Sequence, residues 1–183
     1  SFNNINKCRF YGENSLDHII SCNNTILNLE SKIFNYTKEF IFDNKKYTIN
    51  GNEIYSMFIN YLYKYITSKV SIDSNTTFIF SHSDNYNYFD LNVYKNCLNS
   101  SICNYTIIPN SIAVGLDYGF YKSKKKLFKY EESVLFIDIG HNNISFYIIL
   151  FSNEEIIVEN TYILKESGAD YLDKLLLNYF IKQ

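Results

Sequence analysis

Residues 134–151 read VLFIDIGHNNISFYIILF, and this stretch decides the fold of the C-terminal part of the chain. Two apolar runs, Val134 to Ile139 and Ile144 to Phe151, flank a short polar segment. Continuous apolar runs of this length are typical of strands that are buried on both faces. The pair Asn142-Asn143 favours a tight turn, since Asn tolerates positive φ values. The stretch therefore predicts two neighbouring strands of one sheet, joined by a turn at His141 to Asn143.

Apolar residues at helical spacing predict two helices, at 52–68 and at 169–181. Asn50 with Glu53 resembles a capping box at the start of the first, and Ser167 with Asp170 gives a similar start signal for the second. We expect one face of each helix to be buried. The first face consists of Ile54, Met57, Phe58, Tyr61, Leu62 and Tyr65, and the second of Leu172, Leu175, Leu176, Tyr179 and Phe180.

Weaker patterns predict further elements. These are a helix at 88–99, a short helix after Ser111, and strands at 77–80, 105–108 and 156–163. Helices and strands in this order are typical of an α/β fold with a crossover connection. The lysine-rich stretch Tyr121 to Glu132 is expected to be an exposed connection, and a solvated loop explains its charge better than an anion site.

Composition excludes several classes of protein. The 183 residues are 46% hydrophobic and 20% charged, as in a globular domain. A net charge of -2 does not provide the excess of positive charge that is typical of proteins that bind nucleic acid. No apolar run reaches the roughly 20 residues that a membrane-spanning helix needs. No signal peptide is visible, and the four cysteines read as free buried thiols in a reducing compartment. We therefore expect a cytoplasmic location, with the lumen of the endoplasmic reticulum as the alternative.

One segment suggests chemistry. Asp138 leaves a predicted buried strand and Gly140 follows it in the predicted turn. Such a turn can point backbone N–H groups at an anion, and the carboxylate can hold a hydrated divalent cation that faces phosphates. Spacing alone favours an ordinary hairpin with an Asp at the strand end. His141 has no second His or Cys nearby, which favours a surface or structural imidazole over a metal ligand.

The order of several segments resembles the ATPase domain of the 70-kilodalton heat-shock chaperones, and most closely its 110-kilodalton branch of nucleotide exchange factors. Residues 107–119, IIPNSIAVGLDYG, resemble the interlobe segment of that family, which usually reads IINEPTAAALAYG. Residues 138–141 have the Asp-x-Gly-His form of the 110-kilodalton branch. Other segments resemble the family in the same order: Phe10–Gly12 through Asn23–Ile26, Tyr47 to Tyr65, Val134 to Ile149, and Gly168 to Phe180.

The resemblance implies an α/β fold of the actin-like (ribonuclease-H-like) class, with mixed five-stranded-type sheets packed by helices. It divides the chain into the end of the outer part of lobe one (1–47), the core of lobe one (48–130) and the start of lobe two (131–183). An interlobe joint is expected near Tyr118 to Glu132. The first phosphate hairpin of the family would precede Ser1 and its adenosine-clasping subdomain would follow Gln183. This stretch alone is therefore not expected to enclose a nucleotide.

The resemblance also implies ATP and magnesium as ligands of the parent protein. The phosphates would lie on Asp138, Gly140, His141, Asn142 and Asn143, with Asp138 reaching magnesium through water. The implied partners are a conventional 70-kilodalton chaperone and unfolded client proteins, the latter through a domain outside this chain. Neither nucleic acid nor a membrane is implied.

Two departures from the family argue against hydrolysis. The main branch reads DLGGGT at the second phosphate hairpin, whose Thr corresponds here to Asn143, and the Glu of its NEPT motif corresponds to Asn110. Each lost group is expected to cost on the order of 10²–10³ in rate, because phosphoryl transfer depends on positioning and charge stabilisation. We therefore expect an ATP-binding exchange factor. The alternatives are an ATP-hydrolysing chaperone with replaced catalytic groups and a degenerate scaffold without nucleotide.

Overall fold

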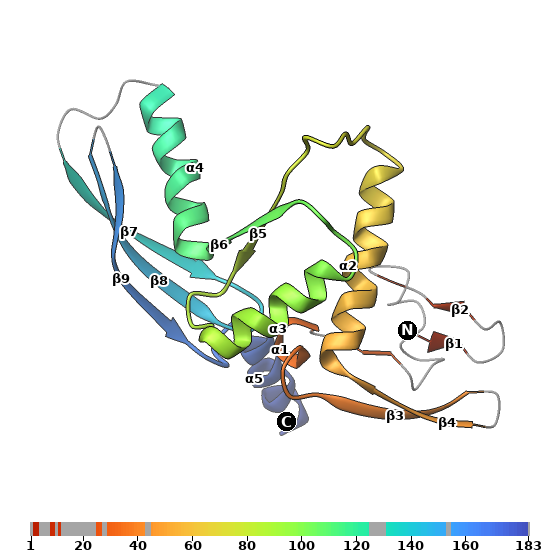
Figure 1. Cartoon of the computed structure of the whole chain (residues 1–183). Helices are drawn as coiled ribbons and strands as arrows, with labels where there is room; N and C mark the ends of the chain where they lie inside the picture. The colour runs from red at the N-terminus through yellow and green to blue at the C-terminus, as the bar shows by residue number, and fades with distance from the viewer. Residues whose placement is uncertain are drawn as a thin grey trace. The chain divides into compact units, whose positions relative to one another are not determined.

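The structure is a computed structural model that describes residues 2–3, 8–9, 11, 25–26, 29–42, 45–124, 131–152 and 155–182 (Figure 1). The chain divides into two compact units. Unit 1 comprises Ser1–Phe78 with Asn87–Tyr105, and unit 2 comprises Ile79–Tyr86 with Thr106–Gln183. The division into lobe segments at 47/48 and 130/131 stays a prediction. Of the segments that carry the resemblance, Phe10–Gly12 and Asn23–Ile26 lie largely outside the described residues.

The described residues of unit 1 form two antiparallel strand pairs and three helices. Its elements are β1 (Phe2–Asn3), β2 (Cys8–Arg9), α1 (Leu29–Lys32), β3 (Thr37–Phe42), β4 (Lys45–Asn50), α2 (Gly51–Thr67) and α3 (Tyr88–Asn99). The capping box of α2 is confirmed: the Glu53 N–H donates to Asn50 Oδ1 at 3.0 Å, and the Asn50 N–H donates to Glu53 Oε2 at 2.9 Å. The predicted helices at 52–68 and 88–99 are therefore confirmed within one residue at each end.

Burial in unit 1 follows the predicted face of α2 only in part. Ile54 is buried, whereas Tyr65, at the far end of the same face, is 54% exposed. The other four residues of that face are half-buried. Of the cysteines whose side chains are described, Cys97 is a buried free thiol as expected, but Cys103 is exposed.

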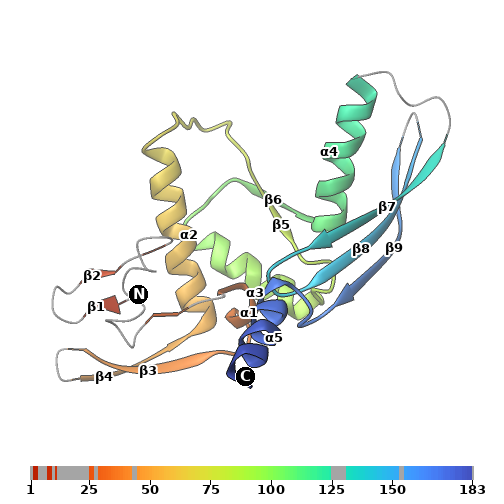
Figure 2. The same ribbon diagram turned by 180° about the vertical axis from the view of Figure 1, so that it is seen from behind.

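Unit 2 is built around a three-stranded antiparallel sheet with the order β7-β8-β9 (Figure 2). Its elements are α4 (Asn110–Lys124), β7 (Glu132–Ile139), β8 (Ile144–Phe151), β9 (Ile156–Leu164) and α5 (Ala169–Ile181). Two further strands, β5 (Phe78–His82) and β6 (Tyr105–Pro109), pair with each other and come earlier in the chain. The first residue of each of these two strands belongs to unit 1. Ile139 pairs with Ile144, so the predicted hairpin and its turn are confirmed. Among the described residues the largest sheet has three strands, not the five that were expected.

Helix α4 covers one face of this sheet (Figure 1). The core beneath it consists of Tyr147, Ile149 and Phe151, packed against partly buried side chains from α4, β7 and β9. Gly115 of α4 allows the close approach, because a Cβ there would lie 3.3 Å from the Ile149 side chain. Tyr118 completes the contact, with its ring centroid 5.1 Å from that of Phe151.

Two expectations on α4 are corrected. The helix after β6 is not short, since it begins at Asn110 and continues for 15 residues to Lys124. Residues 121–124 are therefore helical and do not form an extended connection. Lys122 is not simply solvated, because its ammonium group is paired with Glu132 at the start of β7. Residues 125–130 lie outside the described residues.

Helix α5 has the predicted bounds but not the predicted environment. None of its residues is buried, and the five apolar side chains of its predicted core face are between 47% and 69% exposed. Its start also differs from the prediction. Gly168 is the N-cap, and Ser167 instead uses its hydroxyl to donate to the Leu164 carbonyl at 2.8 Å. In the part of the chain that the structure describes, no helix is long and apolar enough to cross a bilayer.

The turn between β9 and α5 contains a strained residue. Glu166 has a φ of 55° and is the one non-glycine residue with positive φ in the described part of the chain. Such a conformation costs an L-residue about 1 kcal/mol, a cost that glycine does not have. We expect Glu166→Gly to raise the free energy of unfolding by about 0.5–1 kcal/mol, measured by urea denaturation. Lys165→Gly is the control and should destabilise; equal effects of the two variants would contradict the prediction.

Candidate functional site

The turn between β7 and β8 is held by the first turn of α5. The Ala169 N–H donates to the Gly140 carbonyl and the Asp170 N–H donates to the His141 carbonyl, each at 3.0 Å. The Asn142 carbonyl accepts from two further N–H groups, those of residues 167 and 168, each at 3.2 Å. Three consecutive carbonyl groups of the turn are therefore directed at the N-terminus of α5, whose first N–H groups have no partner within the helix.

This arrangement fixes the direction of the N–H groups in the same turn. A trans peptide places its C=O and N–H on opposite sides, and no cis peptide occurs among the described residues. The N–H groups of His141, Asn142 and Asn143 therefore point away from α5. Consecutive N–H groups directed to one side form an anion-binding arrangement. Gly140 differs from the expectation, since its N–H donates within the turn to the Asn143 carbonyl at 3.0 Å.

Gly168 makes the contact between α5 and the turn possible. A Cβ atom at this position would lie 2.4 Å from both the Gly140 and the His141 carbonyl oxygens. The φ of Gly168 is −74°, which any residue can adopt, so the requirement for glycine is one of space. Sequence analysis included Gly168 in the segment Gly168 to Phe180 that resembles the family, but not among the site residues. A glycine directly before a predicted helix is the signal that could have indicated close backbone packing at this position.

Asp138 lies next to last in β7, where its backbone pairs with buried Ser145 of β8. Alternation along β7 places its side chain on the face of Phe136, which packs against the core under α4. The Asp138 side chain is thus on the α4 side of the sheet, at the strand end that leads into the turn. Sequence analysis predicted this strand-end position.

The hydroxyl group of Tyr147 is buried, and two of the predicted site residues influence its pKa. Tyr147 is 1% exposed, and burial raises the pKa of its hydroxyl. The charges of Asp84 and Asp138 raise this pKa further, whereas hydrogen bonding with Ser145 and Asn110 lowers it. Asp138 and Asn110 therefore both influence the pKa of this buried hydroxyl. Sequence reasoning missed Tyr147 and Asp84, because neither lies in a recognisable motif.

His141 lies near the first turn of α5, since its carbonyl accepts from the Asp170 N–H. The pKa of Asp170 is lowered chiefly by its hydrogen bond with Lys174, at 2.5 Å, and also by the charge of His141. Among the described residues, no group of three or more His, Cys, Asp and Glu side chains is placed to hold a metal ion. A cation at Asp138 would therefore depend on water and on the ligand for its other contacts.

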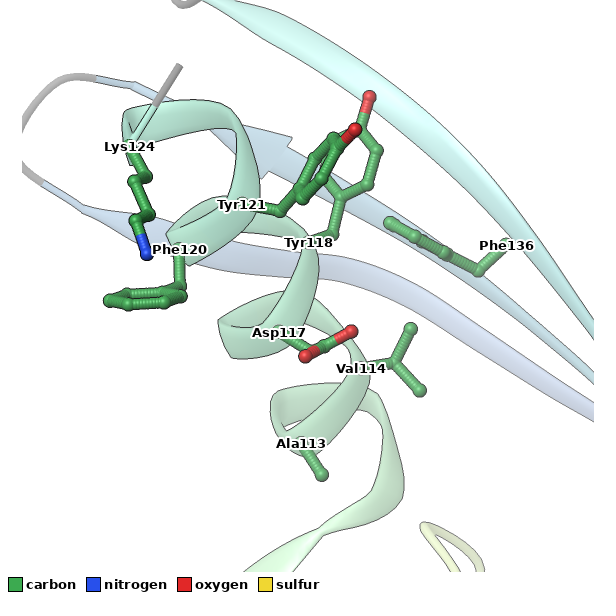
Figure 3. Close-up of a pocket in the computed structure, with 8 residues that line it drawn as sticks. All are labelled: Ala113, Val114, Asp117, Tyr118, Phe120, Tyr121, Lys124 and Phe136. Atoms are coloured by element: carbon green, nitrogen blue, oxygen red, sulfur yellow. The ribbon is translucent and has the colours of Figure 1, made fainter. Parts of the chain in front are cut away.

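A separate groove runs along α4 beside β7 (Figure 3). It has a volume of about 780 Å³, and aromatic side chains dominate its lining. Phe136 lies opposite Tyr118 and Tyr121, and the Lys124 ammonium group is 5.9 Å from the centre of the Phe120 ring. None of the side chains lining the groove belongs to the turn or to the group around the Tyr147 hydroxyl, so we do not include the groove in the candidate site.

Unit 2 thus has a strand–turn–strand unit that is braced by a helix N-terminus and faces a second helix, within a mixed α/β structure. A family model described as "Hsp70 protein" matches residues 102–183. The matched part extends from β6 through α5 and includes Asn110, Asp138 and the turn. This match supports membership of the Hsp70 superfamily and therefore a chaperone, heat-shock protein. The mixed α/β structure is consistent with part of an actin-like domain. None of the curated proteins matches this sequence.

Proposed function

We propose that this chain belongs to the nucleotide-binding domain of a divergent chaperone of the 70/110-kilodalton heat-shock superfamily, which binds ATP and acts as a nucleotide exchange factor. The observation that carries the proposal is the direction of the N–H groups of His141, Asn142 and Asn143. They share one side of a turn in which the carbonyl groups of Gly140, His141 and Asn142 accept from the N–H groups of residues 167–170 at the start of α5. Asp138 lies immediately before this turn, so a phosphate group and a cation would have adjacent partners.

The residues present fit magnesium and phosphate. Magnesium is usually held in proteins by one or two carboxylates together with substrate phosphates and several waters, and Asp138 supplies one such carboxylate. The three turn N–H groups would bind phosphate oxygens. Magnesium, when bound, would neutralise phosphate charge, and Asp138 would hold it through water.

The same residues favour binding over hydrolysis. A water that attacks a phosphate must be oriented and must lose a proton, and a carboxylate serves both purposes. Asn110 stands at the position of the family's Glu, and an amide can orient water but cannot accept its proton. We therefore propose slow or absent hydrolysis in the parent protein.

The proposed partners follow from the 110-kilodalton resemblance at residues 138–141. The parent protein would bind a conventional 70-kilodalton chaperone and accelerate its nucleotide release, and would bind unfolded clients through a domain outside this chain. The proposed location is the cytoplasm, with the lumen of the endoplasmic reticulum as the alternative.

Calorimetric titration of the full-length parent protein with MgATP tests the proposal. We expect Asp138→Ala to weaken binding about tenfold or more, because it removes the carboxylate that faces the cation. This difference should disappear when magnesium is removed. Asp117→Ala is the matched control, since Asp117 is exposed on α4, and its affinity should equal that of the wild type.

Four results would contradict parts of the proposal. Absence of MgATP binding to the wild-type protein would favour the degenerate scaffold. Single-turnover hydrolysis as fast as that of a conventional 70-kilodalton chaperone would favour the enzyme. Equal magnesium-dependent affinity in wild type and Asp138→Ala would contradict the site assignment. Failure to accelerate nucleotide release from a conventional partner would contradict the exchange function alone.

A further inference from the structure

Asp84, in the segment after β5, is joined to the first turn of α4. The Ser111 N–H donates to one carboxylate oxygen of Asp84 at 3.1 Å, and the Ser111 hydroxyl donates to the other oxygen. Ser111 is 1% exposed, so this contact is shielded from water on the side of the helix. Both residues belong to unit 2, although 27 positions separate them in the sequence.

The contact suits the chemistry of a helix start. The first N–H groups of a helix have no partner within it, and the helix dipole favours negative charge at this end. Asp84 supplies both a hydrogen-bond acceptor and a charge. Because Asp84 lies two residues after the end of β5, the segment that leaves this strand is fixed to the start of α4 and therefore to Asn110, the first residue of the helix.

On the sheet side, Tyr147 links the same residues. Burial raises the pKa of its hydroxyl, the charges of Asp84 and Asp138 raise it further, and hydrogen bonding with Ser145 and Asn110 lowers it. A buried phenol that stays protonated can serve as a donor between these groups. Groups from three chain segments thus influence this hydroxyl: the segment after β5, the start of α4, and the β7–β8 hairpin.

We propose that Asp84 is a positioning residue of the nucleotide site: through its hydrogen bonds with Ser111 it holds the first turn of α4 and thereby fixes the neighbouring Asn110. This inference rests on the proposed function and adds to it a residue to which no motif assigns a role. Asp84 acts through Ser111 and Asn110 and need not touch the nucleotide. Its removal should therefore affect binding only while Asn110 is present.

The experiment compares variants of the full-length parent protein by MgATP titration. We expect Asp84→Ala to weaken MgATP binding about fivefold or more, since loss of positioning in a polar site lowers its affinity. Asp84→Asn keeps one acceptor oxygen and should recover most of the affinity, and Ser111→Ala, which removes only the hydroxyl donor, should have a smaller effect of the same sign. Asp117→Ala, on the exposed side of the same helix, is the control and should bind like the wild type.

A double-mutant cycle separates positioning from general stability. In an Asn110→Ala background, Asp84→Ala should weaken binding by less than about twofold, because the residue that it positions is gone. An undiminished effect in that background would overturn the inference, as would an unchanged affinity of Asp84→Ala in the wild-type background. Both results would leave the proposed function intact.

Amide hydrogen exchange at Ser111 gives a readout without nucleotide. If the wild-type protein binds no MgATP, the proposed function fails, and exchange decides whether Asp84 still anchors α4. Faster exchange at Ser111 in Asp84→Ala than in Asp117→Ala would support the anchor. Equal exchange in the two variants would overturn it.

Discussion

Replacing Gly168 with alanine is expected to separate the first turn of α5 from the β7–β8 turn. The new Cβ would lie 2.4 Å from two backbone oxygens, those of Gly140 and His141, and neither belongs to a flexible side chain that could move aside. Overpacking of this kind costs about 1–3 kcal/mol, and each backbone hydrogen bond lost with it about 0.5–1.5 kcal/mol more. We expect the free energy of unfolding of unit 2 to fall by about 3 kcal/mol or more.

The functional consequence should be equally large. The turn carbonyls lose their partners when α5 moves, and the N–H groups of His141, Asn142 and Asn143 then lose their common direction. Urea denaturation measures the loss of stability, and MgATP titration of the parent protein measures the loss of binding. Ala169→Ser is the control, since it adds an atom to an exposed neighbour and should change stability by less than about 0.5 kcal/mol. A Gly168→Ala variant as stable as Ala169→Ser would show that α5 is not docked on the turn.

The central hairpin could be predicted from sequence because its signals are local. Long apolar runs on both sides of a short polar segment favour one arrangement, and the observed pairing of Ile139 with Ile144 follows from it. The capping box at Asn50 and Glu53 is local in the same sense, since both groups lie within one helical turn. The position of Asp138 at the strand end was predictable for the same reason.

The start of α5 shows where local signals fail. Ser167 and Asp170 have the spacing of a helix cap, but the N–H groups that they would satisfy already have better acceptors in the carbonyls of the β7–β8 turn. A tertiary contact has replaced the local one, and Ser167 is left to bond the Leu164 carbonyl. No pattern within the α5 segment itself indicates that the carbonyl groups of the β7–β8 turn cap its first turn.

The site was predictable only in its motif residues. Asp138 and the turn were found because they are contiguous. Asp84 and Tyr147 were missed because their significance lies in long-range proximity: one follows β5, and the other reads as an ordinary apolar position in a buried strand. Asn110 was identified through the resemblance, but its influence on the pKa of Tyr147 depends on how α4 packs on the sheet.

The two apolar positions Ile149 and Leu176 are expected to respond very differently to the same substitution. Ile149 is 0% exposed and belongs to the core under α4, so Ile149→Ala should lower the free energy of unfolding by about 2–5 kcal/mol. Leu176 is 57% exposed on α5, so Leu176→Ala should change it by less than about 0.5 kcal/mol. The sequence predicted burial of both residues, Leu176 from helical periodicity and Ile149 from its place in a continuous apolar run.

Urea denaturation of the 183-residue chain, followed by a probe in unit 2, measures both effects. The physical reason for the difference is that periodicity shows which side of a helix is apolar, whereas burial depends on whether another element covers that side. In the described part of the chain, nothing buries the apolar side of α5. Leu175→Ala, at a similarly exposed neighbouring position, should behave like Leu176→Ala. A loss of about 2 kcal/mol or more in either α5 variant would mean that this face is packed in solution, and the original prediction of a buried face would then be right.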